Sequence, residues 1–232
     1  MKKGKLIVFE GADGSGKTTQ AELLLNYLRK KKIPSAYISF PRYDSMWGQE
    51  VRKYLAGDFG KVGEVDPHLI SLIYAGDRLA ASSKIKNWID QGKVVVCNRY
   101  VGSSIGHQTA NIAGTKEQEE FIVWLTKLEY GQNKIPKEDL VLFLHVPVEV
   151  SQKLMRNRKL DMHESNVPHL VKTVEVYTKY AQGQKNWLKI ECSMGGKLLS
   201  HDEIHGKILA VLKRKKILHF VQNDRSKVLD DK

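Results

Sequence analysis

The chain of 232 residues is poor in cysteine and proline, and it lacks a long apolar run. Its two cysteines, Cys97 and Cys192, lie far apart and without metal-ligand spacing, which argues against a disulfide framework and predicts two buried thiols in a reducing cytoplasm. No apolar stretch approaches the roughly 20 residues needed to cross a bilayer. No Pro-, Ser- or Gly-rich linker divides the chain. We therefore expect one domain at 1–216, followed by a loosely ordered extension at 217–232.

Acidic residues are in the minority, with 26 against 38 lysines and arginines and a formal net charge of +12. Such a surplus suits nucleic acid, an acidic membrane or phosphorylated small molecules, and charge alone does not choose among them. We expect phosphorylated small molecules, and not a membrane, to be the ligands. Nucleic-acid binding through the basic tail is kept as a minor alternative.

Apolar runs and helical patterns alternate along the chain. Strands are expected at 5–10, 35–40, 93–97, 140–146 and 187–191. Helices are expected from Lys17 onward, from Asp66-Pro67 to about Asp90, from a capping-box pattern at 115–118 to near Gly131, and from a second such pattern at 200–203. This alternation predicts an α/β fold with a five-stranded parallel sheet, in which ligands collect at the carboxyl ends of the strands.

The most specific signal is FEGADGSGKTTQ at residues 9–20, which fits the phosphate-loop pattern G-x-x-x-x-G-K-[ST] between an expected strand and an expected helix. Backbone N–H groups of such a loop converge on phosphate oxygens, Lys17 reaches the β- and γ-phosphates, and Thr18 places its hydroxyl on Mg²⁺. ATP is the expected donor because no guanine-binding signature is present. The predicted ATP-binding residues are Gly11, Ala12, Asp13, Gly14, Ser15, Gly16, Lys17, Thr18 and Thr19.

Phosphoryl transfer to a phosphorylated acceptor needs further positive charge opposite Lys17. Three arginines lie at expected strand ends or on a facing helix, namely Arg42, Arg78 and Arg99. They predict a second phosphate-binding group.

Six segments taken together resemble the thymidylate kinase family, in the bacterial form. They occur in the family's order from Lys5 to about Leu212, and they read FEGADGSGKTTQ, SFPRYDS, IYAGDRLAAS, VVVCNRYVGSSIGHQ, DLVLFLHVPVEV and RNRKLDMHE. The resemblance implies a three-layer α/β/α P-loop kinase fold with a mobile lid at about 154–166. It also implies a homodimer that converts ATP and dTMP into ADP and dTDP with Mg²⁺.

The resemblance also assigns residues to the acceptor. It implies that Asp13 contacts the sugar 3′-hydroxyl, Arg42 grips the acceptor phosphate, Tyr74 stacks on thymine and Arg78 binds a thymine carbonyl oxygen. Arg99 extends toward the transferring phosphate. The whole implied acceptor set is Asp13, Phe40, Arg42, Tyr74, Arg78, Asn98, Arg99, Ser103, Ser104 and Gln108.

The sequence departs from the family pattern at two places. Asn98 stands where the family has a carboxylate, which removes a negative charge beside Mg²⁺, and Glu10 is the nearby candidate to replace it. The phosphate loop lacks an arginine. Catalytic charge is therefore expected from the lid, at Arg156, Arg158 and Lys159.

Two alternatives stay open at this point. One is a kinase of the same fold that acts on dUMP, UMP or a deoxynucleoside, and the other is a nucleotide-binding protein that no longer catalyses transfer. His107 and His145 are expected to be structural, because neither has an evident partner in the sequence.

Overall fold

The computed structural model describes residues 3–155, 161–163 and 165–217. Five parallel strands form the main sheet in the order β2-β3-β1-β4-β5. Their bounds are β1 Lys5–Glu10, β2 Ser35–Ser39, β3 Val94–Asn98, β4 Leu140–His145 and β5 Trp187–Glu191. A small antiparallel pair follows, formed by β6 Ser193–Met194 and β7 Lys197–Leu198. The predicted five-stranded parallel sheet is confirmed.

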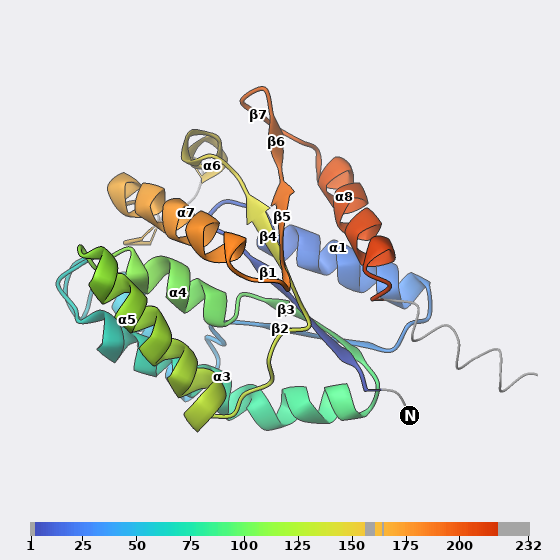
Figure 1. Cartoon of the computed structure of the whole chain (residues 1–232), viewed down its shortest axis with the longest axis horizontal. Helices are drawn as coiled ribbons and strands as arrows, with labels where there is room; N and C mark the ends of the chain where they lie inside the picture. The colour runs from blue at the N-terminus through green and yellow to red at the C-terminus, as the bar shows by residue number, and fades with distance from the viewer. Residues whose placement is uncertain (1–2, 156–160, 164, 218–232) are drawn as a thin grey trace, which may run out of the picture.

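Helices cover both faces of this sheet (Figure 1). Their bounds are α1 Lys17–Lys30, α2 Met46–Ala56, α3 Pro67–Asp90, α4 Val101–Thr109, α5 Thr115–Thr126, α6 Val148–Met155, α7 Val167–Gln182 and α8 His201–Arg214. On one face, α1 and α8 pack over a buried apolar cluster. On the other face, α3, α4, α5 and α7 enclose a second cluster. This is the three-layer α/β/α arrangement.

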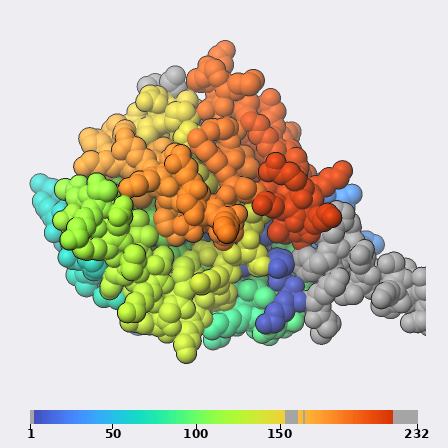
Figure 2. All heavy atoms as spheres, in the orientation of Figure 1, coloured from blue at the N-terminus to red at the C-terminus, as the bar shows by residue number. Residues whose placement is uncertain are grey.

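The outer layer on the second face is formed in part by α5 and α7. These two helices lie side by side on the side of the molecule turned to the viewer, drawn in green and orange (Figure 2). Lys179 of α7 pairs with Glu119 of α5 at 3.6 Å. Both side chains are largely exposed, so the pair adds little stability.

The central strand β1 decides where the site forms. Its neighbours are β3 and β4, with Phe9 opposite Asn98 on one side and opposite Leu142 on the other. Because β1 and β3 are parallel and end at the same edge, the loop after β1 lies beside the residues that follow Asn98. The backbone N–H of Arg99 donates to the carbonyl of Phe9 at 2.9 Å, which joins the two strand ends.

The helix starts test the capping predictions. Asp66 caps α3 through its carboxylate, which accepts from His68 N and Leu69 N, and Ser200 and Glu203 form a complete capping box at α8. The prediction of a capping box at 115–118 is wrong. Gly114 occupies the cap position and supplies no side chain, so α5 begins at Thr115 without a side-chain cap. Its α-helical part ends at Thr126, and a π-helical turn, η1 Lys127–Gln132, follows.

Within the described residues, no helix is both long and apolar enough to cross a membrane. Residues 156–160 and 164 of the expected lid at about 154–166 lie outside the described residues. The expected C-terminal extension lies outside them after Ile217.

Candidate functional site

The loop between β1 and α1 has the backbone that close approach to a phosphate requires. Gly11 has φ 149°, and a Cβ atom there would lie 2.6 Å from the carbonyl oxygen of Leu144. Gly16, the cap residue of α1, has φ 81° in the left-handed region. Among the described residues no side chain caps the first turn of α1. Its N–H groups and the positive end of the helix dipole are therefore available to an anion.

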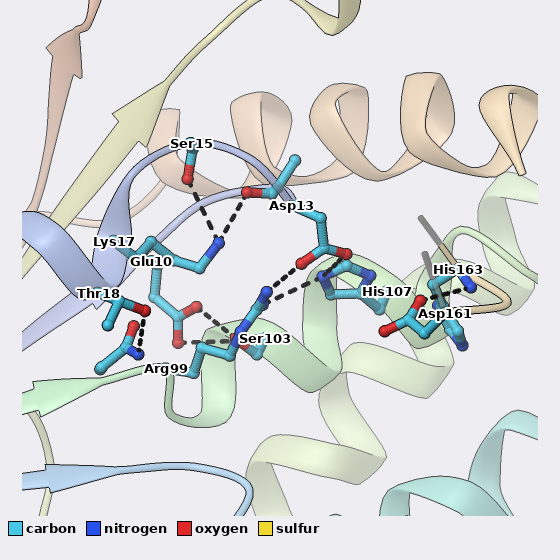
Figure 3. Close-up of polar contacts among 12 residues, drawn as sticks. Glu10, Asp13, Ser15, Lys17, Thr18, Arg99, Ser103, His107, Asp161 and His163 are labelled. Carbon is cyan, nitrogen blue, oxygen red and sulfur yellow. Dashed lines mark hydrogen bonds and ion pairs between the residues drawn. The ribbon is translucent and has the colours of Figure 1, made fainter. Parts of the chain in front are cut away.

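Lys17 lies over this loop. Its ammonium donates to the carbonyl oxygen of Ala12 at 2.7 Å and to the hydroxyl of Ser15 at 3.3 Å (Figure 3). The side chain is buried although it is charged. A buried cation above a ring of backbone N–H groups is suited to phosphate binding. The predicted phosphate-loop residues, 11–19, are thus brought together in one turn between β1 and the start of α1.

Asn98, at the end of β3, lies next to Thr18. Its amide nitrogen donates to the hydroxyl oxygens of Thr18 and Ser39, both at 3.1 Å. Its carbonyl oxygen is buried and finds no hydrogen-bond partner in the part of the chain that the structure describes. The Thr18 hydroxyl and the orphaned amide oxygen of Asn98 are oxygen ligands of the kind that Mg²⁺ prefers, so these residues fit the ion. Unlike a carboxylate, neither group carries a negative charge.

Glu10 does not stand ready to replace the missing carboxylate. Its Oε1 accepts from the backbone N–H groups of Tyr100 at 2.7 Å and Ser103 at 3.0 Å. Its Oε2 accepts from the hydroxyls of Ser103 at 2.7 Å and Tyr177 at 3.0 Å. Four donors already use the carboxylate, so Glu10 fixes the start of α4 against β1 and α7.

Arg99 pairs with Asp13 of the phosphate loop (Figure 3). Arg99 has φ 63°, an uncommon backbone conformation for a residue with a side chain, and its guanidinium also donates to the Ser103 hydroxyl at 3.4 Å. Burial by itself would raise the pKa of Asp13, but the charge of Arg99, assisted by His107 and Lys17, holds that pKa well below its usual range. Asp13 is consequently ionised at any physiological pH.

A cavity of about 320 Å³ opens beside this ion pair. Its walls are Asp13, Pro41, Tyr43, Leu55, Tyr74, Arg99, Ser103, Ser104, His107, Gln108, Asp161 and His163. The volume is within the range of small-molecule sites, and the lining combines aromatic rings with a few polar groups. Six of the predicted acceptor residues line it, namely Asp13, Tyr74, Arg99, Ser103, Ser104 and Gln108.

Four predicted acceptor residues lie outside this lining. Arg42 is held by buried Asp77, which accepts from the Arg42 backbone N–H at 2.7 Å and from its Nε at 3.0 Å. Phe40 is in the apolar core beneath Arg42. Asn98 is the neighbour of Thr18 described above.

Arg78, the fourth, is fully buried and joins the cavity wall to the protein interior. It donates from Nε to Glu129 at 2.9 Å and from a terminal nitrogen to the hydroxyl of Ser104 at 2.9 Å. Glu129 is also fully buried and lies in the π-helical turn η1. The buried carboxylate of Glu129 supplies the opposite charge that a buried arginine needs. Because Arg78 also binds the hydroxyl of Ser104, it fixes the position of Ser104 in the cavity wall. Asp77 pairs with Arg42 and not with its neighbour Arg78.

The comparisons with known proteins agree with this geometry. The family model described as thymidylate kinase matches residues 9–204. The chain belongs to the thymidylate kinase family.

The relatives span most of the chain. A thymidylate kinase of Plasmodium falciparum is 28% identical over 93% of this chain and 93% of its own length. A probable thymidylate kinase of Methanocaldococcus jannaschii is 32% identical over 89% of this chain and 95% of its own. The solved structure of a Candida albicans thymidylate kinase superimposes with a TM-score of 0.74 and covers 93% of both chains at 22% identity, which supports the fold. Membership makes the protein an ATP-dependent nucleoside monophosphate kinase.

The position of His107 in this kinase was not predicted from the sequence. His107 was expected to be structural, but it lines the cavity, and its Nε2 lies 3.4 Å from a nitrogen of Arg99 and 3.9 Å from Asp13. The sequence does contain one indication that His107 lies near the site. His107 precedes Gln108 in the segment that follows the β3 strand end, one helical turn beyond Ser103 and Ser104. His145, by contrast, pairs with Glu191 at 2.7 Å away from the cavity lining.

The segment 161–163 closes the cavity of the kinase on one side. Met162 N donates to the carbonyl of Leu55 at 3.4 Å, and the His163 ring lies 3.0 Å from the hydroxyl of Tyr54. The predicted catalytic cations Arg156, Arg158 and Lys159 lie outside the described residues. They stay predictions.

Proposed function

We propose that the protein transfers the γ-phosphate of ATP to dTMP and releases ADP and dTDP, with both nucleotides meeting at the ion pair of Arg99 and Asp13. The observation that carries this proposal is the position of that pair. It lies between the phosphate loop, which takes the donor, and the cavity, which takes the acceptor. In-line transfer needs the two phosphates to meet at such a point, and positioning with charge neutralisation then suffices.

The donor side uses the loop at 11–19. Its N–H groups and Lys17 hold the β- and γ-phosphates, and Lys17 neutralises charge that develops on the transferring group. Thr18 and the carbonyl oxygen of Asn98 are the groups that would hold Mg²⁺. When bound, the ion adds positive charge beside the phosphates and orients them.

The acceptor side uses the cavity. Tyr74 offers a ring face to the base, while Gln108 and Ser104 offer polar atoms to its edge, and the buried Gln108 Oε1 has no hydrogen-bond partner among the described residues. Asp13 accepts from the sugar 3′-hydroxyl. Arg42, oriented by Asp77, binds the acceptor phosphate, and Arg99 moves from Asp13 toward the transferring phosphate. Arg78 acts through Ser104 as a positioning residue.

Two further proposals concern the lid and the whole chain. Arg156, Arg158 and Lys159 belong to a mobile lid at about 154–166, which brings positive charge onto the donor and excludes water, so that transfer is favoured over hydrolysis. Residues 1–216 form the catalytic domain, and the protein works in the cytoplasm. The buried free thiols of Cys97 and Cys192 suit that reducing compartment.

We also propose a homodimer. Leu69, Leu72 and Leu79 are 45–54% exposed on α3 and, at spacings of three and seven, lie along one face of the helix. An exposed apolar stripe of this kind is typical of an interface between subunits. Light scattering on the purified protein tests it: twice the mass of 26.4 kDa is expected, and the chain mass itself would refute it.

The test of the function is a coupled assay of ADP release with ATP, Mg²⁺ and a panel of acceptors: dTMP, dUMP, UMP, dCMP and thymidine. Preferential turnover of dTMP is the expected result. Turnover of another acceptor would identify a kinase of the same fold with different specificity. ATP binding without any turnover would identify a binding protein.

A further inference from the structure

Three buried histidines meet beside the cavity, and the proposed phosphoryl transfer uses none of them. His107 is on α4, His163 is in the segment 161–163, and His169 is in the first turn of α7. One ring nitrogen of each lies within 4.8 Å of the others. The ring centroids of His163 and His169 are 4.5 Å apart, and His107 lies 5.6 Å and 5.9 Å from them.

We propose that His107, His163 and His169 form a binding site for a divalent transition-metal ion of the Zn²⁺ type. Imidazole nitrogen is the side-chain ligand that such ions share, and three histidines with an open fourth position are a recurrent coordination set. The site is distinct from the Mg²⁺ position at Thr18, because Mg²⁺ prefers oxygen ligands.

The spacing of the nitrogens supports the proposal. Zn–N bonds of about 2.0–2.1 Å in a tetrahedral site place ligand nitrogens roughly 3.3 Å apart. Nδ1 of His163 and Nε2 of His169 share a hydrogen bond at 2.8 Å, whose proton the metal ion would replace, and the wider separations within the 4.8 Å limit close by small rotations of the rings. The Nδ1 atom of His107 is buried and finds no hydrogen-bond partner within the described residues, so the tautomer with its proton on Nε2 offers an unused lone pair there.

The groups around the rings fit ligation as well. If His163 binds through Nδ1, its Nε2 can donate to the Tyr54 hydroxyl at 3.0 Å, which is the outer-shell contact that orients metal-bound histidines. Asp161 accepts from the backbone N–H of His163 at 2.9 Å, and Asp13 lies 3.9 Å from His107 Nε2. These carboxylates offset the positive charge of Arg99, whose nitrogen is 3.4 Å from the same Nε2.

An ion at this place would tie three separate parts of the chain together. His107 and His163 line the acceptor cavity, so an ion bound by them would lie at its wall. The ion would hold the 161–163 segment against α4 and α7.

The test uses Co²⁺ as a spectroscopic probe on the full, tag-free chain after chelator treatment and desalting. Co²⁺ bound by nitrogen ligands in a tetrahedral site has strong visible absorption, which Zn²⁺ abolishes when it displaces Co²⁺. We expect a band that saturates at one equivalent of Co²⁺ and persists with excess Mg²⁺. His163→Gln and His169→Gln should each weaken Co²⁺ binding at least about ten-fold. The exposed His201 serves as the matched control, and His201→Gln should leave the band unchanged.

Two results overturn the proposal. One is the lack of a saturating band in the wild-type chain, which needs no variant to fold. The other is a band that survives both glutamine substitutions in chains whose circular dichroism matches the wild type. Thermal unfolding gives a second measure, since one equivalent of Zn²⁺ should raise the Tm of the wild type and not that of His169→Gln. Neither readout depends on kinase activity, so a negative result for the metal site would leave the proposed function untouched, and the reverse also holds.

Discussion

The guanidinium of Arg99 pairs with the carboxylate of Asp13 across the adjoining ends of β3 and β1. This contact links the phosphate loop to the cavity, because Asp13 belongs to the loop and both residues line the cavity. The left-handed backbone of Arg99 and its bond to the carbonyl of Phe9 aim the side chain there. A residue held in an uncommon conformation between two ligand sites is expected to act on both.

Replacing Arg99 should affect catalysis more than folding. Arg99→Ala removes charge from the place where the transferring phosphate becomes more negative, so we expect kcat to fall by roughly 100-fold or more. Steady-state kinetics with ATP and dTMP measures this, and circular dichroism checks the fold. Arg29→Ala, at an exposed position near the end of α1, is the control and should keep the wild-type rate. A rate near wild type in the Arg99 variant would disprove the role.

Arg42 should determine how well the acceptor phosphate binds. Arg42→Lys keeps a positive charge beside buried Asp77 but loses the planar fork that grips a phosphate with two N–H groups. The KM for dTMP should rise about ten-fold, which corresponds to one charged hydrogen bond, while the KM for ATP stays constant. Equal changes in both KM values would place Arg42 outside the acceptor site.

Asn98 should set the Mg²⁺ requirement. Asn98→Asp adds a negative charge next to the Thr18 hydroxyl, so the Mg²⁺ concentration at half-maximal rate should fall several-fold. Ser39→Ala is the matched control, because the Ser39 hydroxyl accepts a hydrogen bond from the same amide but is not a predicted Mg²⁺ ligand. A Mg²⁺ dependence that is identical in wild type and Asn98→Asp would show that this position does not sense the ion.

Glu138 should make stability depend on pH. Its side chain is partly buried and accepts from the Tyr130 hydroxyl, and burial raises its pKa to about 7 from the usual value of 4.5. The folded state therefore binds the proton more tightly than the unfolded state. The resulting stability is fully present below the unfolded pKa and is lost as the pH rises through about 7.

The comparison is with Glu138→Gln, which mimics the protonated acid. The free energy of unfolding of wild type relative to this variant should fall by up to about 1 kcal/mol per pH unit between roughly pH 5 and pH 7, then level off. Urea unfolding at a series of pH values measures it. Parallel curves for the two proteins would contradict a raised pKa. Contributions from other groups, such as buried histidines, cancel in the difference.

The sequence was most informative where local patterns coincide with burial. The strands β1 and β3 are apolar runs buried on both faces, and Asp66 and Ser200 use side chains that the cap positions favour. The capping box expected at 115–118 failed because the helix start shifted by one residue, and Gly114 took the cap position. Helices α2 and α7 begin at the side-chain caps Ser45 and Asn166, but the sequence pattern did not delimit them, and no described side chain caps α4.

In the candidate site, too, a contiguous motif could be predicted from the sequence, whereas contacts between distant residues could not. The phosphate loop is a contiguous motif and could be predicted entirely from residues 9–20. The roles of Arg42 and Arg78 depend on partners at 77 and 129, which only the folded chain brings near them. His107, His163 and His169 lie on three separate segments, so their proximity leaves no spacing pattern in the sequence.

The most direct test follows the label from γ-³²P-ATP in a reaction with dTMP and Mg²⁺, with Lys17→Ala as the blank. The account predicts labelled dTDP in a one-to-one ratio with ADP, and no labelled dTDP from the blank. Labelled inorganic phosphate without dTDP, or labelled dTDP at the wild-type rate from Lys17→Ala, would contradict the assignment of donor and acceptor sites.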